Sequence, residues 1–275
     1  MRPNTRWGRA IMMALRVLMV LVVLFPIWFA VSASFMDLDE LYMRPPRIIP
    51  SSFQLTYYAD ALHTAPLLRF LGNSLVMSVG IMLGQLVLCS LAAFAFAYFD
   101  FKGKNVIFMA MLATMMIPGE SIVISNYMTI GDLGWYDTFQ GLILPGTASA
   151  ISVFFLRQAF LTVPKELYEV ARLDGCSNLR YLAQLLLPLC KGQLGALGIY
   201  TYIGAWNQYL WPLLVTNKTE MRTVQVGISM LQNSESIAVN MVMAGITIIL
   251  FPSILIFFIG QKQILSGAFT GALKG

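Results

Sequence analysis

The sequence has few of the side chains that cover the surface of a soluble protein. Charged residues occupy 11% of the 275 positions, whereas about 25% is usual in a soluble domain. Apolar residues make up 58%, and 17 Met and 18 Phe are among them. A soluble globule of this length could not cover so much apolar surface. The composition therefore excludes a cytosolic enzyme, a secreted domain and a disordered segment.

Residues of the common catalytic and metal sites are equally scarce. One histidine, His63, cannot by itself build a zinc site or a Ser-His-Asp relay. The three cysteines have neither metal-ligand spacing nor the even number of a disulfide framework. No glycine-rich phosphate loop is present, because Gly103-Lys104 is followed by Asn105 and lacks the earlier glycine. We therefore expect no catalytic residue, metal ligand or cofactor in this chain, and any ATP would be hydrolysed by another polypeptide.

What the sequence has instead is long apolar runs. A hydrocarbon core of about 30 Å needs about 20 apolar residues in a helix, and six segments reach this length. We therefore predict an all-α polytopic membrane protein, with six transmembrane helices in one transmembrane domain over residues 1–275. The expected spans are residues 11–35, 71–99, 106–130 (interrupted by Pro118-Gly119), 138–160, 193–215 and 237–261. A cleaved signal peptide is the alternative for the first span, but its apolar run is long for one.

The basic residues predict the orientation of these spans. Of the 18 Lys and Arg residues, 13 fall on the side of the N-terminus and 5 on the other. Cytoplasmic loops carry the excess of Lys and Arg, so both termini are expected in the cytoplasm. The formal charge of +5 would suggest nucleic-acid binding in a soluble protein. Here the basic residues are concentrated on one side of the membrane, so we expect membrane lipid and no nucleic acid as a partner.

The cytoplasmic loop 161–192 is longer than a turn requires. Pro164 suits the first position of a helix, and Gly175 suits its end, because glycine adopts the left-handed conformation at low cost. A second helix is expected from Ser177-Asn178 to Pro188. The first helix would have two sides, with Lys165, Glu166, Glu169 and Arg172 on the polar one and Leu167, Val170 and Ala171 on the apolar one.

The spacing in this loop resembles the EAA loop of the permeases of binding-protein-dependent ABC importers, which reads E-A-A-x3-G-x9-I-x-L-P. The chain has Glu169-Val170-Ala171, Gly175, Leu185 and Leu187-Pro188 at the same spacing. Val170 and Leu185 are conservative departures from the pattern. The alternative is an ordinary amphipathic connector lying on the inner leaflet.

The resemblance implies a role for the loop and a set of partners. In that family the loop is a coupling helix that docks in a cleft on the cytoplasmic ATPase. The implied partners are a second related permease subunit, two ABC ATPase subunits that bind ATP and Mg, and an extracytoplasmic substrate-binding protein. The implied location is the inner membrane of a bacterial or archaeal cell. The residues that correspond to the coupling site are Glu166, Glu169, Val170, Ala171, Arg172, Asp174 and Gly175.

The whole chain also looks like the second permease subunit of carbohydrate importers of the maltose type. By this likeness the tail 267–275 would reach between the two ATPase subunits. The loop 216–236 would probe the substrate cleft of the binding protein.

The run 205–214 in the fifth expected span indicates a polar solute. Its amides and aromatic rings could hold a sugar or polyol, and polar residues in a span usually face the bundle interior. An aromatic belt near the outer interface explains the same run equally well. The run resembles the corresponding segment of glycerol-3-phosphate permeases. The candidate path residues here are Trp206, Asn207, Gln208, Tyr209 and Trp211.

Glu120 is a further candidate for the translocation path, because it follows the break at Pro118-Gly119. A kink with Glu120 near the outer boundary is the simpler explanation, and a carboxylate in the path would repel a phosphate ester. The expected function is ATP-driven import of a sugar or a polyol-type solute such as glycerol-3-phosphate. The alternative is an ion-coupled secondary transporter, which would need midplane ionisable residues and often a repeat. Only Glu120 is a candidate for such a residue, and no repeat is evident.

Overall fold

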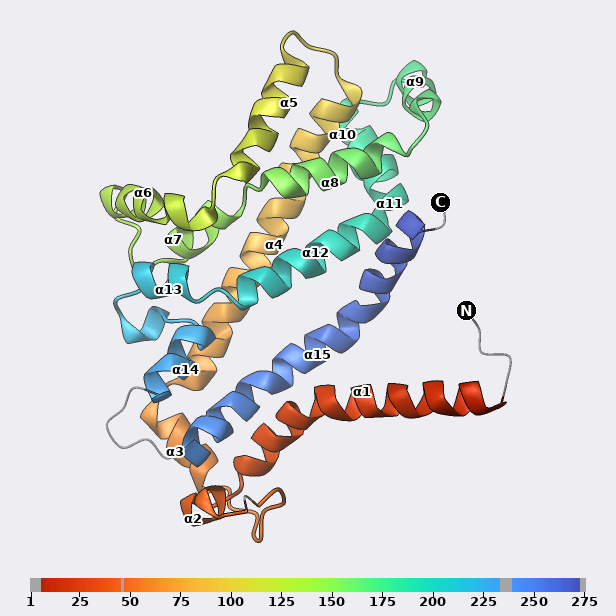
Figure 1. Cartoon of the computed structure of the whole chain (residues 1–275). Coiled ribbons are helices and arrows are strands. Elements are labelled where there is room, and N and C mark those ends of the chain that lie inside the picture. Colours follow the sequence, from red (N-terminus) through yellow and green to blue (C-terminus); the bar gives the residue numbers. More distant parts are fainter. Residues whose placement is uncertain (1–5, 46, 233–238, 273–275) are drawn as a thin grey trace. The chain divides into compact units, whose positions relative to one another are not determined.

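The computed structural model describes residues 6–45, 47–232 and 239–272 (Figure 1), and every regular element in these ranges is a helix. The all-α prediction is thus confirmed for the described part. The chain divides into two compact units. Unit 1 comprises residues 1–68 and 227–254, and unit 2 comprises residues 69–226 and 255–275.

The helices differ greatly in length. They are α1 (Arg6–Ala33), α2 (Leu38–Tyr42), α3 (Thr56–Thr64), α4 (Leu67–Tyr98), α5 (Lys104–Ala113), η1 (Thr114–Met116), α6 (Gly119–Asp132), α7 (Phe139–Ile143), η2 (Leu144–Gly146), α8 (Ala150–Leu161), α9 (Lys165–Leu173), α10 (Asn178–Tyr181), the π-helical η3 (Leu182–Leu186), α11 (Leu187–Leu189), α12 (Lys191–Trp206), α13 (Leu210–Val215), η4 (Thr219–Met221), α14 (Val224–Gln232) and α15 (Val239–Ala272).

Two of these helices are long and apolar enough to cross a membrane unbroken, residues 10–33 of α1 and all of α4. Three further spans are possible if each of three bent helix pairs counts as one, and a shorter apolar helix covers 239–255. The expected number of six spans therefore stays a prediction.

The bends fall inside or beside the expected spans. The α5–η1 helix meets α6 at 101°, α7–η2 meets α8 at 50°, and α10–α11 meets α12 at 84°. The first bend is at the predicted break, since α6 begins at Gly119 directly after Pro118. Proline cannot donate a backbone hydrogen bond, so a helix readily starts after it.

In unit 1, the outer loop after α1 is tied together by polar side chains. The Glu40 side chain is buried and accepts hydrogen bonds from Arg47 Nη1 at 2.8 Å and from the backbone N–H of Ser51 at 3.2 Å. The Ser51 hydroxyl donates to the same oxygen. This last hydrogen bond lowers the pKa of Glu40 most, burial opposes it, and Arg47 lowers it further. The hydrogen bonds of the loop thus favour the ionised form of Glu40.

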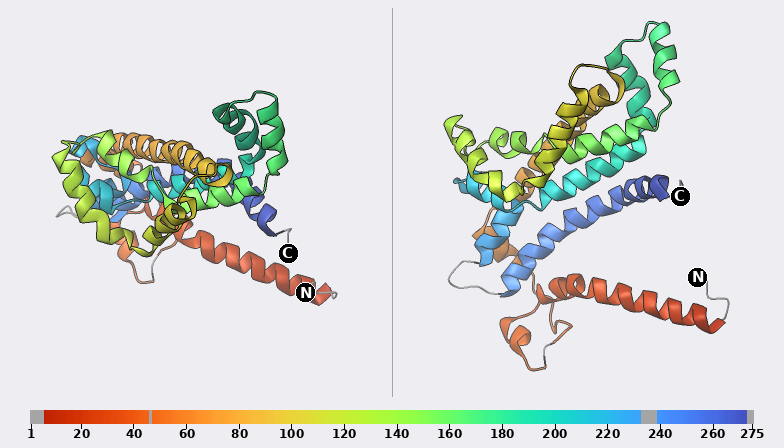
Figure 2. Two further views of the ribbon diagram at one scale, coloured as in Figure 1. Left: turned by 90° about the horizontal axis from the view of Figure 1, so that it is seen from above. Right: turned by 45° about the horizontal axis from the view of Figure 1, so that its top comes forward.

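In unit 2, a single amide on α4 joins this helix to three other segments. Gln85 on α4 donates to the carbonyl of Gly146 at 2.8 Å. Its own carbonyl accepts from Ser152 on α8 at 2.8 Å and from Thr201 on α12 at 3.0 Å. Helices α8 and α12 lie side by side (Figure 2). Hydrogen bonds of this kind hold helices together where no water competes.

Small residues bring α4 close to the α7–η2 segment. Gly84 lies on α4 against Thr147, whose Cγ2 would be 2.4 Å from a Cβ at position 84. Gly80 lies against Ile143 in the same way, at 2.7 Å. A Cβ at position 84 would meet both Cγ2 and Cβ of Thr147, so the backbone would have to shift, whereas a Cβ at position 80 would displace the Ile143 side chain.

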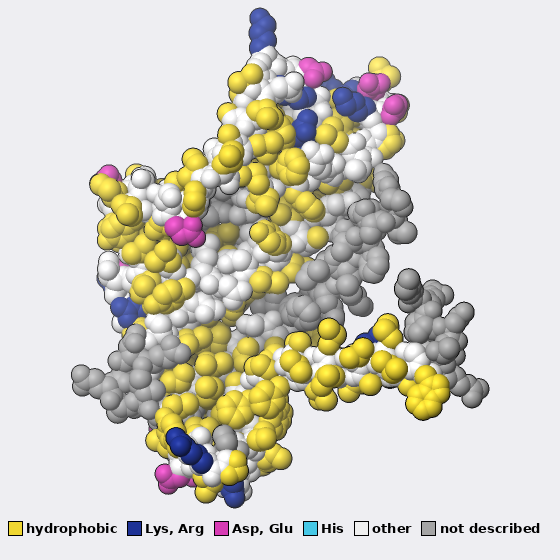
Figure 3. Space-filling view, in the orientation of Figure 1, with side chains coloured by type: hydrophobic (Ala, Val, Ile, Leu, Met, Phe, Trp, Pro, Cys, Tyr) yellow, Lys and Arg dark blue, Asp and Glu magenta, His cyan; other side chains and the backbone are white. Residues whose placement is uncertain are grey.

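Charged side chains collect at one end of unit 2. Figure 3 shows them around α9 and the turn between α4 and α5, while hydrophobic side chains cover the face formed by α5 and α8. An apolar surface bounded by a charged end is what a helix bundle in a bilayer requires.

We predict that the stability of unit 1 falls in acid because of Glu40. Its pKa in the folded protein is below the ordinary value of 4.5, so the stabilisation is present above that pH and is lost as the pH falls through the folded pKa. The thermal unfolding midpoint of the purified protein in detergent should therefore drop below pH 4.5 more steeply for the wild type than for Glu40→Gln. Ser51→Ala should lessen the drop, and identical pH profiles for all three proteins would contradict the assignment.

Candidate functional site

Helix α9 is attached to unit 2 by one of its sides. Ala171 is 8% exposed and belongs to the main apolar core of this unit. The ring of Tyr168, one turn earlier, lies 5.1 Å from that of Tyr98 on α4 and 5.0 Å from that of Tyr181 on α10. The Tyr168 hydroxyl also hydrogen-bonds the side chain of Asn178 at 2.9 Å. An aromatic cluster therefore fixes α9 to the end of α4.

The opposite side of α9 is exposed and partly apolar. Leu167 is 50% exposed, Val170 56% and Leu173 87%. The charged residues expected on this helix are also at the surface, namely Glu166, Glu169, Arg172 and Asp174. Exposed leucines among charges are what a groove on a partner protein can bury.

The placement of Ala171 differs from the expectation that it would share a side with Leu167 and Val170. Successive residues in a helix are about 100° apart, so Val170 and Ala171 diverge. Ala171 follows Tyr168 onto the core side, whereas Val170 follows Leu167 onto the exposed side. Ala171 therefore packs within the chain and is not presented on the exposed side.

The end of α9 has the geometry predicted for Gly175. This residue has φ of +78°, and the N–H of Cys176 donates to the carbonyl of Ala171 at 2.9 Å while that of Gly175 donates to Arg172 at 3.1 Å. Together these bonds form a Schellman motif. The next helix, α10, begins at Asn178, as expected, and the side chain of its N-cap residue Ser177 accepts from the N–H of Arg180. The turn thus fixes where α9 stops and how the chain returns to the core.

A second candidate site lies where the helices of unit 2 are broken. It is a cavity of about 160 Å³ between α6, the α7–η2 segment and the start of α13. The Trp211 indole N–H donates to the carbonyl of Gly141 at 3.1 Å, which sets one wall of the cavity. The lining residues are Gly119, Ile122, Val123, Asn126, Leu142, Pro145, Gly146, Gln208 and Trp211. Two amides and an indole ring in an otherwise apolar cavity suit a small polar solute.

The structure divides the predicted path residues. Gln208 and Trp211 line this cavity, and Glu120 is exposed in the first turn of α6, next to the lining residue Gly119. Trp206 is only 6% exposed and stacks on Tyr202 at 5.9 Å. It does not line the cavity.

The other two path candidates are at the surface. Asn207 is exposed, and its amide donates to the carbonyl of Ile203 at 3.0 Å. Tyr209 is 43% exposed.

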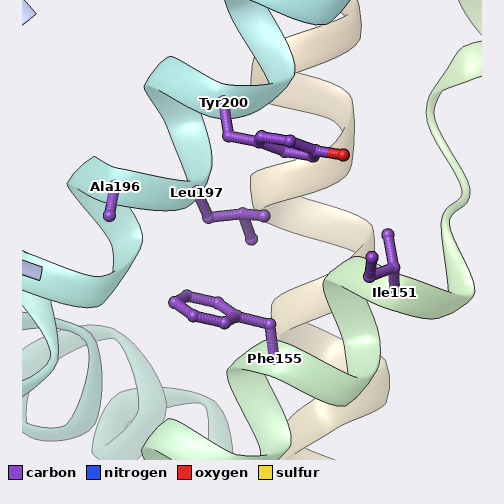
Figure 4. Close-up of a pocket in the computed structure, with 5 residues that line it drawn as sticks. All are labelled: Ile151, Phe155, Ala196, Leu197 and Tyr200. Carbon is purple, nitrogen blue, oxygen red and sulfur yellow. The ribbon is translucent and has the colours of Figure 1, made fainter. Parts of the chain in front are cut away.

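An apolar cavity of about 340 Å³ between α8 and α12 was not expected from the sequence (Figure 4). Phe155 and Leu197 point toward each other across it, with Ile151, Ala196 and Tyr200 around them. In a chain rich in apolar spans, apolar residues at helical spacing give no sign of a cavity, because the same pattern serves any packed or lipid-facing helix.

The family model for the inner membrane component of binding-protein-dependent transport systems matches residues 85–267, which include both the α9 loop and the residues of the polar cavity. The chain belongs to this family. Its members are transport proteins of the inner membrane, in agreement with the expected class.

Relatives extend the match to nearly the whole chain. The sn-glycerol-3-phosphate transport system permease protein UgpE of Escherichia coli O1:K1 is 35% identical over 275 residues, which cover 97% of this chain and 98% of the relative. UgpE of Agrobacterium fabrum is 34% identical over 276 residues with the same coverage. The family assignment therefore does not depend on the EAA-like loop alone.

The fold agrees with this family. A chain of a bacterial ABC transporter involved in the import of the acidic polysaccharide alginate superimposes with a TM-score of 0.84 at 21% identity, covering 95% of this chain and 99% of that one. The chain thus has the fold of an ABC importer permease.

We predict that Gly175→Ala destabilises the end of α9 by about 1–2 kcal/mol, the cost of a left-handed conformation for a residue with a Cβ. No atom lies within 4 Å of such a Cβ, so the cost is conformational rather than steric. Gly175→Asn should lose less. Gly204→Ala is the matched control, since its Cβ also meets nothing within 4 Å and no left-handed φ is present. Amide hydrogen exchange at residues 174–176 measures the effect, and equal exchange in the Gly175→Ala variant and the wild type would contradict it.

Proposed function

We propose that this chain is one of two related permease subunits of an ATP-driven importer. Two ATPase subunits in the cytoplasm bind ATP and Mg and hydrolyse the nucleotide, and an extracytoplasmic protein delivers the solute. The chain supplies the passage and the coupling, and no bond chemistry. Both termini lie in the cytoplasm, as the distribution of Lys and Arg favours.

The observation that carries this proposal is the exposed side of α9. A rigid helix that presents Leu167, Val170 and Leu173 among charges can dock in a groove on an ATPase subunit. Its other side is held by Tyr168 and Ala171, so a displacement of the ATPase would move α4 as well. Glu166, Glu169, Arg172 and Asp174 flank the contact, and Gly175 sets its end.

The proposed solute is a small polyol phosphate or a sugar, with sn-glycerol-3-phosphate as the first candidate. The names of the relatives support this choice, as do the amides of Gln208 and Asn126 in the polar cavity. Trp211 offers a ring face to the solute. Glu120 follows the lining residue Gly119 in the chain, and its carboxylate would disfavour a free anion there unless the partner permease supplies a cation.

Two further roles follow the family resemblance. The loop 216–236 would contact the binding protein, although residues 233–238 lie outside the described residues. The tail 267–275 would reach between the ATPase subunits, and residues 273–275 likewise lie outside the described part.

We predict that Leu167→Ser combined with Leu173→Ser uncouples the ATPase from the permease. Loss of two exposed leucines from a docking surface should lower both co-purification of the ATPase subunits and solute uptake by more than about tenfold. Leu133→Ser is the control, because Leu133 is also 50% exposed but lies at the end of α6. Normal association and uptake in the double variant would refute the coupling role of α9. Uptake driven by a proton or sodium gradient without any ATPase would favour the ion-coupled alternative.

We also predict that Gln208→Leu lowers uptake of labelled sn-glycerol-3-phosphate by up to about tenfold, the value of one hydrogen bond to the solute. The measurement uses proteoliposomes that contain the complete transporter, ATP inside and the loaded binding protein outside. Gln140→Leu, an exposed amide that does not line the cavity, should leave uptake unchanged. If Gln208→Leu and Gln140→Leu behave alike, the cavity is not on the path.

A further inference from the structure

Asp137 has a backbone conformation that no other non-glycine residue of the described ranges has. Its φ is +57°, in the left-handed region that disfavours residues with a Cβ. Asp is one of the few types that enter this region. A residue keeps this conformation only when contacts with the surrounding structure stabilise it. The hydrogen bonds of Asp137 identify these contacts.

The contacts join Asp137 to a segment 80 residues further along the chain. One carboxylate oxygen accepts the backbone N–H of Asn217 at 2.7 Å and that of Lys218 at 2.8 Å. The N–H of Asp137 itself donates to the carbonyl of Val215 at 2.9 Å. Consecutive N–H groups form a concavity that binds anions, and bonds to a carboxylate are stronger than neutral ones. The start of the 216–224 segment is thus fixed by one side chain.

The other end of the 216–224 segment is fixed by α4. The Asn73 amide donates to the carbonyls of Glu220 at 2.8 Å and of Arg222 at 2.9 Å. Arg69 donates to the same Glu220 carbonyl at 2.9 Å, and the Ser74 hydroxyl accepts the N–H of Val224 at 2.9 Å. The main chain of the segment is therefore held at both ends.

This arrangement engages the backbone of the segment and leaves three of its polar side chains at the surface. Asn217, Lys218 and Glu220 are exposed, and together they present an amide, a cation and a carboxylate on a fixed backbone. A pre-shaped surface of mixed polarity loses little conformational entropy when a partner protein binds to it.

The position of the segment along α4 indicates which partner it meets. Asn73 lies near the start of α4, while Tyr98, which contacts the α9 cluster, is its last residue. With a rise of about 1.5 Å per residue these positions are roughly 37 Å apart, more than the hydrocarbon thickness of about 30 Å. If α9 is cytoplasmic, the 216–224 segment is on the outer side of the membrane.

We propose that Asp137 is a positioning residue, and that its carboxylate holds the 216–224 segment in the shape in which Asn217, Lys218 and Glu220 contact the extracytoplasmic binding protein. This inference rests on the proposed function. Asp137 does not touch the partner or the solute, and it acts through the backbone of the segment.

Three substitutions separate the hydrogen bonds from the backbone conformation. Asp137→Gly keeps the positive φ but removes the acceptor. Asp137→Asn keeps an acceptor oxygen and a side chain that tolerates the left-handed region. Asp137→Ala loses both. In the complete transporter in proteoliposomes, ATPase activity is measured against the concentration of loaded binding protein.

The expected result is a shift in half-saturation. Asp137→Gly should raise the half-saturating concentration of binding protein by about tenfold with little change in the maximal rate, and Asp137→Asn should stay within about twofold of the wild type. Amide exchange at Asn217 and Lys218 should be faster in Asp137→Gly and near wild type in Asp137→Asn. Asp137→Ala should show the largest shift of the three.

Two results would overturn the inference. One is an unchanged half-saturating concentration in Asp137→Gly. The other is a fall in maximal rate alone, which would indicate a general structural defect. A wild-type transporter that binding protein does not stimulate at all would overturn the proposed function itself and this inference with it.

Discussion

The constraint on which the rest of unit 2 depends is the absence of water from the hydrocarbon core. Each break in a helix exposes backbone groups that must find partners in the protein or line a cavity. At the starts of α7 and α8 the partners are nearby side chains. The Thr138 hydroxyl accepts the N–H of Gly141, and the Ser149 hydroxyl accepts the N–H of Ser152. At the breaks beside Gly119 and Gln208, the non-helical chain lines the polar cavity instead. The breaks and the candidate path therefore have one physical origin.

Helix α4 connects the features described for this unit. Its first turns hold the 216–224 segment through Asn73 and Ser74. Its middle holds α8 and α12 through Gln85. Its last turn holds α9 through the ring of Tyr98. Because a helix of 32 residues without an internal proline is stiff, it suits the transmission of rigid-body motion between the two faces of a membrane.

Much of this could be predicted from the sequence because it depends on local chemistry. The break at Pro118, the helix end at Gly175 and the start at Ser177 follow from residues that act on their own neighbours. The orientation of side chains around a helix was harder to predict. Ala171 turns toward a core cluster built from other helices, and Trp206 is buried where it stacks on Tyr202 of its own helix. Periodicity alone does not say which side of a helix the rest of the protein covers. The bonds of Asp137 join residues 80 positions apart, and no local pattern marks them.

The π-helical turn at Leu182–Leu186 has a consequence for insertions and deletions in this family. A π turn holds more residues per turn than an α-helix, so removing one residue there would restore ordinary winding. The π turn takes up one extra residue locally, so this deletion would leave the helical phase on either side of it nearly unchanged. A one-residue deletion inside α9 has no such bulge to remove, and it would turn the residues before it by about 100°. The loop should therefore tolerate a deletion at Leu182–Leu186 better than one in α9.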